Sequence, residues 1–347
     1  MEIVRNGYTV EIGEPTLYVD NESRHRSGHM THGLAEFAPG KIIDFNSNCS
    51  PLRTSGHSTF GFVEYKISED GGETFSEIYQ LPYSLECLFD GIHVISVEKA
   101  VACEGRIVAF CLRNCATSLC TPWDTPMIVT SDDGGKSWSA PRELCSFKGR
   151  IYDARCHGGV IYALEFCNDA ATDFLGQTEE HVYRIFVSRD KGESFEELCV
   201  PPLPTLGRAY GAMLFDDKGD LHLYAYNAND EEHIDHVVSH DSGLTWDAPS
   251  ACFMKEGIRN PQVAQINGIF VAHGRSKGKD GFVVYTSLDG EVWDEGVYIA
   301  HVRGVCYYSN SIVLKDAEGN DRLLIQYSEN YERNCVNVKH VWLKIKK

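Results

Sequence analysis

Four arginines recur in this sequence at similar distances from a repeated phrase, and their type and spacing point most directly to chemistry. Each follows the opening serine of one copy of the phrase by 16 to 20 residues. A guanidinium is planar and donates parallel hydrogen bonds, so arginine suits the recognition of carboxylate, sulfate or phosphate. If repeated units bring the side chains together, the sequence predicts a site for an anionic ligand. They are Arg150, Arg208, Arg259 and Arg303.

Three more arginines, Arg26, Arg155 and Arg275, are further candidates for substrate binding. The alternative is that each arginine is paired inside the fold, for example Arg150 with Asp153 or Arg259 with Glu256. Converging cations repel one another, so acidic neighbours or the ligand must offset the repulsion.

A pair of tyrosines lies shortly after Arg303, in the run Arg303-Gly-Val-Cys-Tyr307-Tyr308-Ser309. Nearby arginines favour the phenolate form, and a carboxylate that takes the proton makes a phenol a nucleophile. Tyr308, or its neighbour Tyr307, is therefore a candidate nucleophile. Packing at the centre of the fold, or an ordinary hydrogen bond, is the alternative. No motif fixes the base, for which the candidates are Glu165, Glu231 and Glu232.

Histidines offer a rival chemistry, because imidazole titrates near neutral pH and suits general acid or base catalysis. Four gather near the N-terminus, and another precedes an arginine in the run His273-Gly-Arg275. A core or surface position without catalytic role is the alternative for each of them. The four are His25, His29, His32 and His57, and we consider His32 a catalytic candidate.

The elements that would position these residues come from the phrase Ser-x-Asp-x-Gly-x-(Ser/Thr)-(Trp/Phe). Full copies begin at Ser68, Ser131, Ser188 and Ser239, a shortened copy begins at Ser287, and the serines lie 48 to 63 residues apart. Such a period is typical of one repeated supersecondary unit. Within the phrase, Asp accepts hydrogen bonds of its own turn, Gly supplies a positive φ and the aromatic residue anchors the turn. We therefore interpret the aspartates as structural: Asp70, Asp133, Asp190, Asp241 and Asp289.

Between the phrases, apolar residues alternate or form compact runs, as in residues 106–112 and 221–226. This pattern predicts short β-strands, and helical periodicity is scarce. About four strands fit in each repeat, which is one blade of a β-propeller. We predict an all-β, six-bladed propeller of four-stranded antiparallel blades in a single domain, 1–347. The blades lie near 23–85, 86–147, 148–203, 204–254, 255–299 and 302–347, and a strand from 1–22 completes the last.

The phrase is the Asp-box, or BNR repeat. With six blades, arginines at the blade openings and Tyr-Ser in the last blade, the chain resembles the sialidase (neuraminidase) superfamily of glycoside hydrolases along nearly its whole length. The resemblance implies three arginines on the carboxylate of an acidic sugar, a tyrosine nucleophile with a glutamate base, and an aspartate of the first blade as acid. Carried over by position, Arg208, Arg259 and Arg303 would form the clamp, and Tyr308 or Tyr307 would be the nucleophile.

The sequence departs from the family in two places. The stretch from Ser23 to His32 replaces the Arg-Ile-Pro opening of the first blade. Where sialidases usually carry Leu-Leu-Tyr-Glu, this chain reads Leu-Leu-Ile-Gln326-Tyr, although Glu329 is near. Two other functions therefore stay open. One is cleavage of uronic-acid glycans by His, Tyr and Arg through hydrolysis or β-elimination, and the other is glycan binding without catalysis.

The composition and charge of the chain limit the kinds of molecule that it is expected to bind. With 43% hydrophobic and 24% charged residues, the chain has the composition of an ordinary globular protein. Its net charge of −18 argues against nucleic acid and anionic membranes as partners. No apolar stretch has the length of a membrane span or a secretory signal, so we predict a cytoplasmic protein. The expected partner is an acidic mono- or oligosaccharide, and no visible motif requires a metal or an organic cofactor.

The cysteines support the same compartment. The chain has thirteen cysteines, an odd number, and most of them lie in apolar runs. We therefore predict buried thiols in a reducing environment rather than a disulfide framework. Cys111, Cys115 and Cys120 raise the question of a zinc site, but their spacing is loose and no second pair follows.

Overall fold

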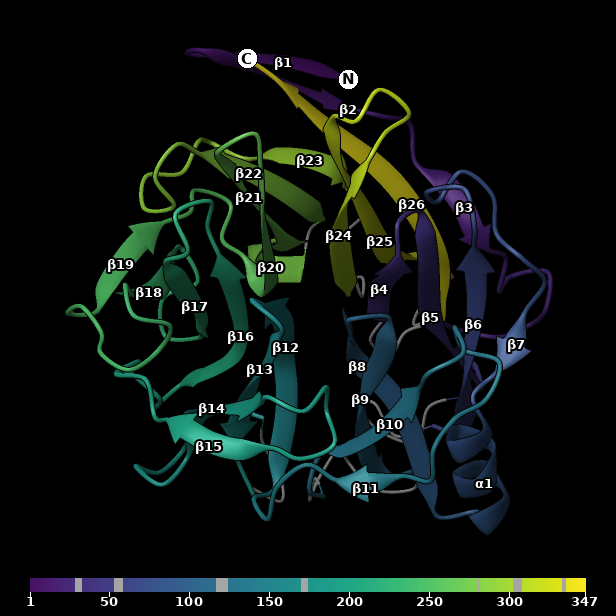
Figure 1. Cartoon of the computed structure of the whole chain (residues 1–347). Coiled ribbons are helices and arrows are strands. Elements are labelled where there is room, and N and C mark those ends of the chain that lie inside the picture. The colour runs from purple at the N-terminus through teal and green to yellow at the C-terminus, as the bar shows by residue number, and fades with distance from the viewer. Residues whose placement is uncertain are drawn as a thin grey trace.

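The computed structural model is a ring of six β-sheets around a common axis, and it confirms the all-β, six-bladed propeller (Figure 1). It describes residues 1–28, 33–52, 59–116, 124–169, 174–279, 281–301, 308–332 and 335–347. Each innermost strand packs against the next, and the last packs against the first, which closes the ring. The innermost strands are β4 (Gly33–Ala38), β8 (His93–Cys103), β12 (Gly149–His157), β16 (Arg208–Phe215), β20 (Arg259–Ile266) and β24 (Ser309–Lys315).

Blades 1 to 5 each contain four antiparallel strands that follow one another outward from the axis in chain order. Blade 1 continues with β5 (Lys41–Cys49), β6 (Gly61–Ser68) and β7 (Tyr79–Gln80), and blade 2 with β9 (Arg106–Cys115), β10 (Met127–Ser131) and β11 (Arg142–Glu143). Blade 3 continues with β13 (Val160–Cys167), β14 (Val182–Ser188) and β15 (Glu196–Cys199), and blade 4 with β17 (Leu221–Asn227), β18 (His233–Ser239) and β19 (Ser250–Phe253). Blade 5 continues with β21 (Ile269–Arg275), β22 (Phe282–Ser287) and β23 (Val297–Ala300).

Blade 6 is built from both ends of the chain. After β24 come β25 (Asp321–Glu332) and β26 (Cys335–Lys346), and two N-terminal strands, β2 (Tyr8–Ile12) and β3 (Thr16–Val19), both pair with β26. β1 (Glu2–Arg5) pairs with β2 at the outer edge of this sheet. Backbone hydrogen bonds therefore join the beginning of the chain to its last strand, and the closed ring leaves fewer strand edges exposed.

A buried polar cluster also joins blade 6 to blade 1. The Asp44 carboxylate on β5 accepts hydrogen bonds from His340 Nε2, at 2.7 Å, and from the Gln326 amide. The Tyr18 ring stacks on the His340 ring with 3.9 Å between centroids. Burial raises the pKa of Asp44, and the contact with His340 opposes that effect. Gln326 thus serves the contact between the first and last blades.

Two short helices interrupt the sheets in the described part of the chain. α1 (Pro82–Asp90) connects blades 1 and 2 and packs against β6 and β8. Proline suits the first turn of a helix, and Gly91, with a φ of 69°, ends this one in the left-handed conformation. η1 (Lys277–Lys279) is a single 3-10 turn in blade 5. Within the described ranges, no helix has the length and apolar character needed to cross a bilayer.

Apolar side chains gather between neighbouring blades. Each contact between adjacent blades has its own buried cluster, such as Phe45 with Ile95 between blades 1 and 2 and Tyr224 with Val283 between blades 4 and 5. Full burial of a side chain of this size contributes about 1.5–3 kcal/mol. The blades therefore stabilise one another, and the axis is left for polar residues.

The five Asp-boxes form the turns between the third and fourth strands of blades 1 to 5. In every copy the opening serine hydroxyl donates to the aspartate, at 2.7–3.0 Å. In the four full copies the aspartate also accepts the amide and the hydroxyl of the Ser or Thr four residues on. Hydrogen bonds from Thr74 lower the pKa of Asp70 to about 2. These contacts confirm that the aspartates hold the turns.

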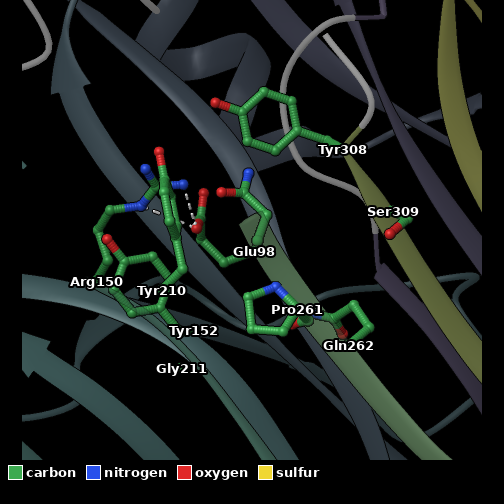
Figure 2. A pocket seen from close by; sticks show the side chains of 10 residues that line it. Glu98, Arg150, Tyr152, Tyr210, Gly211, Pro261, Gln262, Tyr308 and Ser309 are labelled. Carbon is green, nitrogen blue, oxygen red and sulfur yellow. Dashed lines mark hydrogen bonds and ion pairs between the residues drawn. The ribbon is translucent and has the colours of Figure 1, made fainter. Parts of the chain in front are cut away.

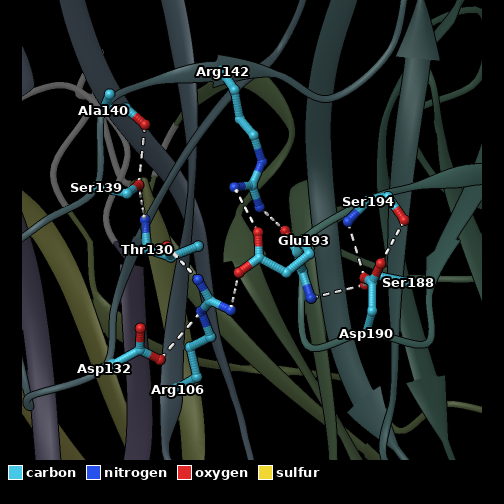
Figure 3. A network of polar contacts seen from close by, with 11 residues as sticks. Arg106, Thr130, Asp132, Ser139, Ala140, Arg142, Ser188, Asp190, Glu193 and Ser194 are labelled. Atoms are coloured by element: carbon cyan, nitrogen blue, oxygen red, sulfur yellow. Dashed lines mark hydrogen bonds and ion pairs between the residues drawn. The ribbon is translucent and has the colours of Figure 1, made fainter.

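The third Asp-box also ties its blade to the preceding one (Figure 3). Glu193, inside this turn, forms ion pairs with Arg106 of β9 and Arg142 of β11. Arg142 also donates to the backbone carbonyl of Gly192. The polar groups of this turn are thus engaged in contacts within the fold.

Candidate active site

Four consecutive innermost strands carry a β-bulge, at which the pairing with the second strand of the blade slips. The register shifts occur in β8, β12, β16 and β20, and β4 has a further one at Phe37, which does not line the pocket described below. A bulge re-aims the extra side chain and is frequent next to active sites. In β8, β12, β16 and β20 the residues left without a strand partner are Glu98, Tyr152, Tyr210, Asn260 and Pro261.

All of these bulge residues line one pocket, which lies among the innermost strands (Figure 2). Among the described residues, five of the six blades contribute to it, because Ser309 at the start of β24 and Tyr308 just before it also line the pocket. The bulges of β8, β12, β16 and β20 therefore supply five of the ten lining residues. The other lining residues are Arg150, Gly211 and Gln262.

Most of these positions lie at nearly the same distance in the sequence from the preceding Asp-box. Tyr152, Tyr210, Asn260 and Tyr308 lie 21, 22, 21 and 21 residues after the opening serine of the preceding Asp-box. Glu98 lies 30 residues after Ser68, and the nine residues of α1 account for the difference. The arginine spacing does not point to Tyr152, Tyr210 or Asn260, whereas this spacing does, and it reaches Glu98 only once α1 is discounted.

Arg150 and Glu98 form a buried ion pair between blades 3 and 2. Arg150 Nε and Nη2 lie 3.0 and 2.6 Å from Glu98 Oε2, and both side chains are 3% exposed. Burial alone lowers the pKa of Arg150, but Glu98 and the phenols of Tyr152, Tyr308 and Tyr210 outweigh it and raise the pKa. The internal partner of Arg150 is thus Glu98 rather than Asp153.

Tyr308 is surrounded by guanidinium groups. Its side chain is buried, and the guanidinium carbon of Arg275 lies 5.5 Å from its ring centroid. Its phenol also interacts electrostatically with Arg150 and Arg259. In Figure 2 the Tyr308 hydroxyl points toward the side of the pocket on which Arg150 lies. Cations near a phenol favour its ionised form.

Arg259 lies in an aromatic enclosure. Its guanidinium carbon is 5.2 Å from the ring centroid of Phe174, 5.3 Å from that of Tyr226 and 5.8 Å from that of Tyr210. The nearest carboxylate is that of Glu231, at 3.8 Å, whereas Glu256 accepts a hydrogen bond from Tyr298 instead. Arginine stacked on aromatic rings keeps its orientation and its charge.

Of the three arginines in the predicted clamp, Arg208 and Arg259 lie in the described residues, and they differ in their partners. Arg208 is neutralised inside its own blade, with Nε and Nη2 at 2.8 and 3.3 Å from the two Asp235 oxygens. Its remaining nitrogen donates to the Leu206 carbonyl. Arg208 is therefore unsuited to bind a substrate carboxylate. Arg303 lies outside the described residues, as do Tyr307, His29, His32 and His57.

The other arginine candidates have partners away from the pocket. Arg26 donates to the side-chain and backbone oxygens of Asn48. Arg155 lies further along β12, where it bridges Asp153 and the backbone carbonyls of Met213 and Val263. Both are structural in this arrangement, and neither lines the pocket. Arg275 reaches the pocket only through its contact with the Tyr308 ring.

A polar cluster closes the axis next to the pocket. Lys99 Nζ contacts Asp153 at 2.9 Å and the side-chain oxygens of Gln262 and Asn310 at 2.6 Å each. These residues come from four different blades. Burial lowers the pKa of Lys99 to about 8, although Asp153 opposes the effect. The cluster fixes Gln262, which lines the pocket.

The glutamates predicted as bases lie elsewhere. Glu165 is fully buried inside blade 3, where Cys145 donates to it at 3.1 Å, and burial raises its pKa to about 7. Glu231 accepts a hydrogen bond from Tyr226 and lies beside Arg259. Glu232 pairs with Lys277, and Glu329 with Lys339. None of the four lines the pocket, and in the part of the chain that the structure describes the lining carboxylate is that of Glu98.

The described histidines do not reach the pocket either. His25 is exposed. His273 is fully buried beside Ser309, with 3.0 Å between Nδ1 and Oγ, and burial lowers its pKa to about 3. Within the described ranges, no three His, Cys, Asp or Glu side chains are arranged to hold a metal ion.

Several polar atoms of the described residues at or beside the pocket are buried without a hydrogen-bond partner. Three of them are the Tyr152 hydroxyl, Asn260 Oδ1 and Arg259 Nε, and Arg275 Nε is another. Buried polar groups in proteins are nearly always paired, and an orphaned one needs an explanation. A polar ligand would supply the missing partners, because the three atoms include both donors and acceptors.

Comparison with known proteins defines the class of this chain as an Asp-box β-propeller with the fold of sialidases. The family description "BNR/Asp-box repeat" matches residues 129–140, and no curated protein matches the sequence. A Dyadobacter fermentans protein of unknown function has a similar fold, with a TM-score of 0.71 and 14% identity over 97% of this chain and 99% of its own.

Solved sialidases share the fold at similarly low identity. The NanB sialidase of Streptococcus pneumoniae gives a TM-score of 0.68 and 11% identity, covering 95% of this chain and 70% of the sialidase. The Trypanosoma rangeli sialidase in complex with sialic acid gives 0.61 and 13%, covering 97% of this chain and 59% of the sialidase. Likeness at this identity establishes the architecture, and the chemistry must be argued from the side chains.

Proposed function

We propose that this protein is a glycoside hydrolase of the sialidase-like type that acts on a carboxylate-bearing sugar. The observation that carries the proposal is the environment of Tyr308, which faces the axial pocket among Arg150, Arg259 and Arg275. Solved sialidases have this fold, and one of them holds sialic acid. Tyrosine nucleophiles are known in sialidases, where they replace the usual carboxylate.

In the proposed reaction the Tyr308 oxygen attacks the anomeric carbon while its proton passes to Glu98, the carboxylate that lines the pocket. The bond to the leaving oxygen breaks, and that oxygen takes a proton from an acid, which the family resemblance places in the first blade. Water then attacks the same carbon, transfers its proton to that acid's conjugate base and releases Tyr308. Glu98 returns its proton to the phenolate.

Arg259 is the arginine best suited to hold the substrate carboxylate. Its side chain is 19% exposed, its Nε atom is orphaned and its nearest carboxylate is 3.8 Å away. A substrate carboxylate would satisfy the free donor, and the hydroxyl groups of the sugar would pair with Tyr152 and Asn260. This pattern favours an acidic mono- or oligosaccharide as the partner.

We also propose a cytoplasmic location. The eleven described cysteines are all free thiols, and most of them are buried. Thiols persist in the reducing cytoplasm, whereas oxidising compartments favour disulfides.

The first test is turnover of fluorogenic α-sialosides beside saturated and unsaturated glucuronides. Sialoside hydrolysis by the protein supports the proposal, and release from glucuronides alone replaces sialic acid with a uronic acid as the substrate. The second test is Tyr308→Phe, which should lower kcat by about 10³-fold or more because the nucleophile is lost. Tyr79→Phe, a matched change at an exposed tyrosine of blade 1, should leave kcat unchanged.

A glycan-binding protein without catalysis would give a different result. It would bind N-acetylneuraminic acid or glucuronic acid in calorimetry, turn over none of the substrates, and keep its affinity in the Tyr308→Phe variant. That combination would overturn the proposed enzyme.

A further inference from the structure

We infer that Arg150 is a positioning residue of the Tyr308 and Glu98 pair and not a ligand of the substrate carboxylate. The inference rests on the proposed function and deepens it. It assigns different tasks to two arginines, Arg150 and Arg259, that occupy equivalent places at the openings of their blades.

The geometry of Arg150 separates it from a substrate ligand. Two of its nitrogens already face the same oxygen of Glu98, and its side chain is 3% exposed. Glu98 Oε1 accepts a further hydrogen bond from Ser96, at 3.3 Å. A substrate carboxylate could bind Arg150 only by displacing Glu98, which would leave a buried carboxylate without its cation.

Arg259 differs in each of these respects. It is 19% exposed, carries an orphaned Nε and has its carboxylate neighbour at 3.8 Å. The aromatic rings beside it carry no negative charge. Of the two equivalent arginines, Arg259 can therefore accept an anion at its free Nε while its long ion pair with Glu231 stays in place.

The charge of Arg150 acts on the nucleophile as well as on the base. The titratable groups that face Tyr308 are Glu98 on β8, Arg150 and Tyr152 on β12, Tyr210 on β16, Arg259 on β20 and Arg275 on β21. Burial raises the pKa of Tyr152, and Arg150 opposes the rise. By the same interaction Arg150 favours the phenolate of Tyr308.

Removal of Arg150 should therefore change the chemistry rather than the binding. Without its cation, the buried Glu98 carboxylate favours its protonated form, and the Tyr308 phenolate loses a stabilising charge. Both effects require a higher pH for activation of the nucleophile. The acidic limb of the kcat profile should move to higher pH, while KM stays close to its original value.

The experiment compares Arg150→Met with Arg259→Met on the substrate that the protein turns over. Arg150→Met should lower kcat by about 100-fold, change KM less than about threefold and shift the acidic limb upward, whereas Arg259→Met should raise KM by about tenfold or more. Arg150→Lys keeps the charge and should restore part of kcat and the original acidic limb. A rise in KM for Arg150→Met equal to that of Arg259→Met would overturn the inference.

A second measurement does not depend on turnover. Tyrosinate absorbance is titrated in the full-length protein, and the difference from Tyr308→Phe isolates the Tyr308 component. Arg150→Met should move that component to higher pH, and Arg150→Lys should return it. An unmoved component would refute the role of Arg150 even if the protein hydrolyses no glycoside, so this failure is distinct from failure of the proposed function.

Loss of folding is controlled with a paired variant. Arg150→Met with Glu98→Gln removes both charges and leaves no unpaired ion in the pocket. If Arg150→Met fails to fold, the paired variant carries the tyrosinate titration, with Glu98→Gln alone as its reference. The Tyr308 component should still move to higher pH in the paired variant. A component that stays at the same pH as in Glu98→Gln would contradict the inference.

Discussion

The Asp-box turns at the outer strands and the bulges at the axis both repeat around the ring, but they differ in how their polar groups are satisfied. In the turns, each aspartate is held by its own serine, and in the full copies by a second Ser or Thr. At the axis, the Tyr152 hydroxyl and Asn260 Oδ1 are buried without partners. Polar groups that are paired inside the protein stabilise the fold, whereas buried polar groups without partners can form hydrogen bonds to a ligand.

The two regions also differ in sequence. The Asp-box turns keep the same key residue types in blades 1 to 5, because each must form the same local hydrogen bonds. The corresponding positions at the axis carry Glu98, Tyr152, Tyr210, Asn260 and Tyr308, so glutamate, tyrosine and asparagine occupy equivalent places around the pocket. In this propeller, repetition of residue type marks structure, and repetition of position with changed residue type marks the site.

The first prediction concerns a satisfied network between blades. Asp44→Ala removes the acceptor for His340 and the Gln326 amide. The free energy of unfolding should fall by about 3–5 kcal/mol, because buried donors lose their partner. Urea unfolding followed by fluorescence measures the change. Asp217→Ala, at an exposed aspartate, is the matched control and should change the value by less than about 0.5 kcal/mol. Equal midpoints for the two variants would show that the cluster does not hold the ring closed.

The second prediction concerns an orphaned atom away from the pocket. Glu165 Oε1 is buried without a partner, and burial raises the Glu165 pKa from 4.5 to about 7. The stability that this group provides is therefore present below pH 4.5 and is lost as the pH rises through 7. Glu165→Gln should stabilise the protein at pH 8 by about 3 kcal/mol relative to its effect at pH 4.5.

The same variant separates Glu165 from catalysis. Since Glu165 does not line the pocket, kcat should be unchanged in Glu165→Gln. Thermal unfolding at both pH values and steady-state kinetics measure the two effects. A large loss of kcat would return Glu165 to the list of candidate bases and weaken the contrast between turns and axis.

The architecture could be predicted from the sequence because its determinants are local. Each Asp-box specifies a turn through residues at most seven positions apart, and alternation of apolar residues specifies the strands between turns. Closure by residues 1–22 followed from the missing strand in the last blade, and β2 and β3 pair with β26.

The site was harder to predict because the partners of its arginines come from other strands of the same blade or from other blades. The regular spacing of the arginines after the Asp-boxes pointed to Arg150, Arg208 and Arg259. No local pattern reveals that Asp235 neutralises Arg208 or that Glu98 pairs with Arg150. The insertion of α1 also moved Glu98 out of the phase shared by the other bulge residues. Ion pairing across blades is a property of the assembled ring and is not encoded in spacing.

The third prediction tests an orphaned group inside the pocket. Tyr152→Phe removes a hydroxyl that has no partner in the free protein. Stability should stay within about 0.5 kcal/mol or rise slightly, since no hydrogen bond is lost. Affinity for an acidic sugar should fall by about tenfold, which is one lost hydrogen bond of about 1.4 kcal/mol. Calorimetric titration measures the affinity. A loss of stability with unchanged affinity would mean that the hydroxyl serves the fold instead of the ligand.

The smallest effect is expected at a satisfied turn on the surface. Hydrogen bonds from Ser137 lower the pKa of Asp133 from 3.8 to about 2. The stability that this aspartate provides is therefore present above pH 3.8 and is lost as the pH falls through 2. Asp133→Asn should flatten the decline of the urea midpoint between pH 4 and pH 2 while leaving turnover at neutral pH unchanged. An altered KM or kcat would place the turn in contact with substrate, and the division between a structural rim and a functional axis would fail.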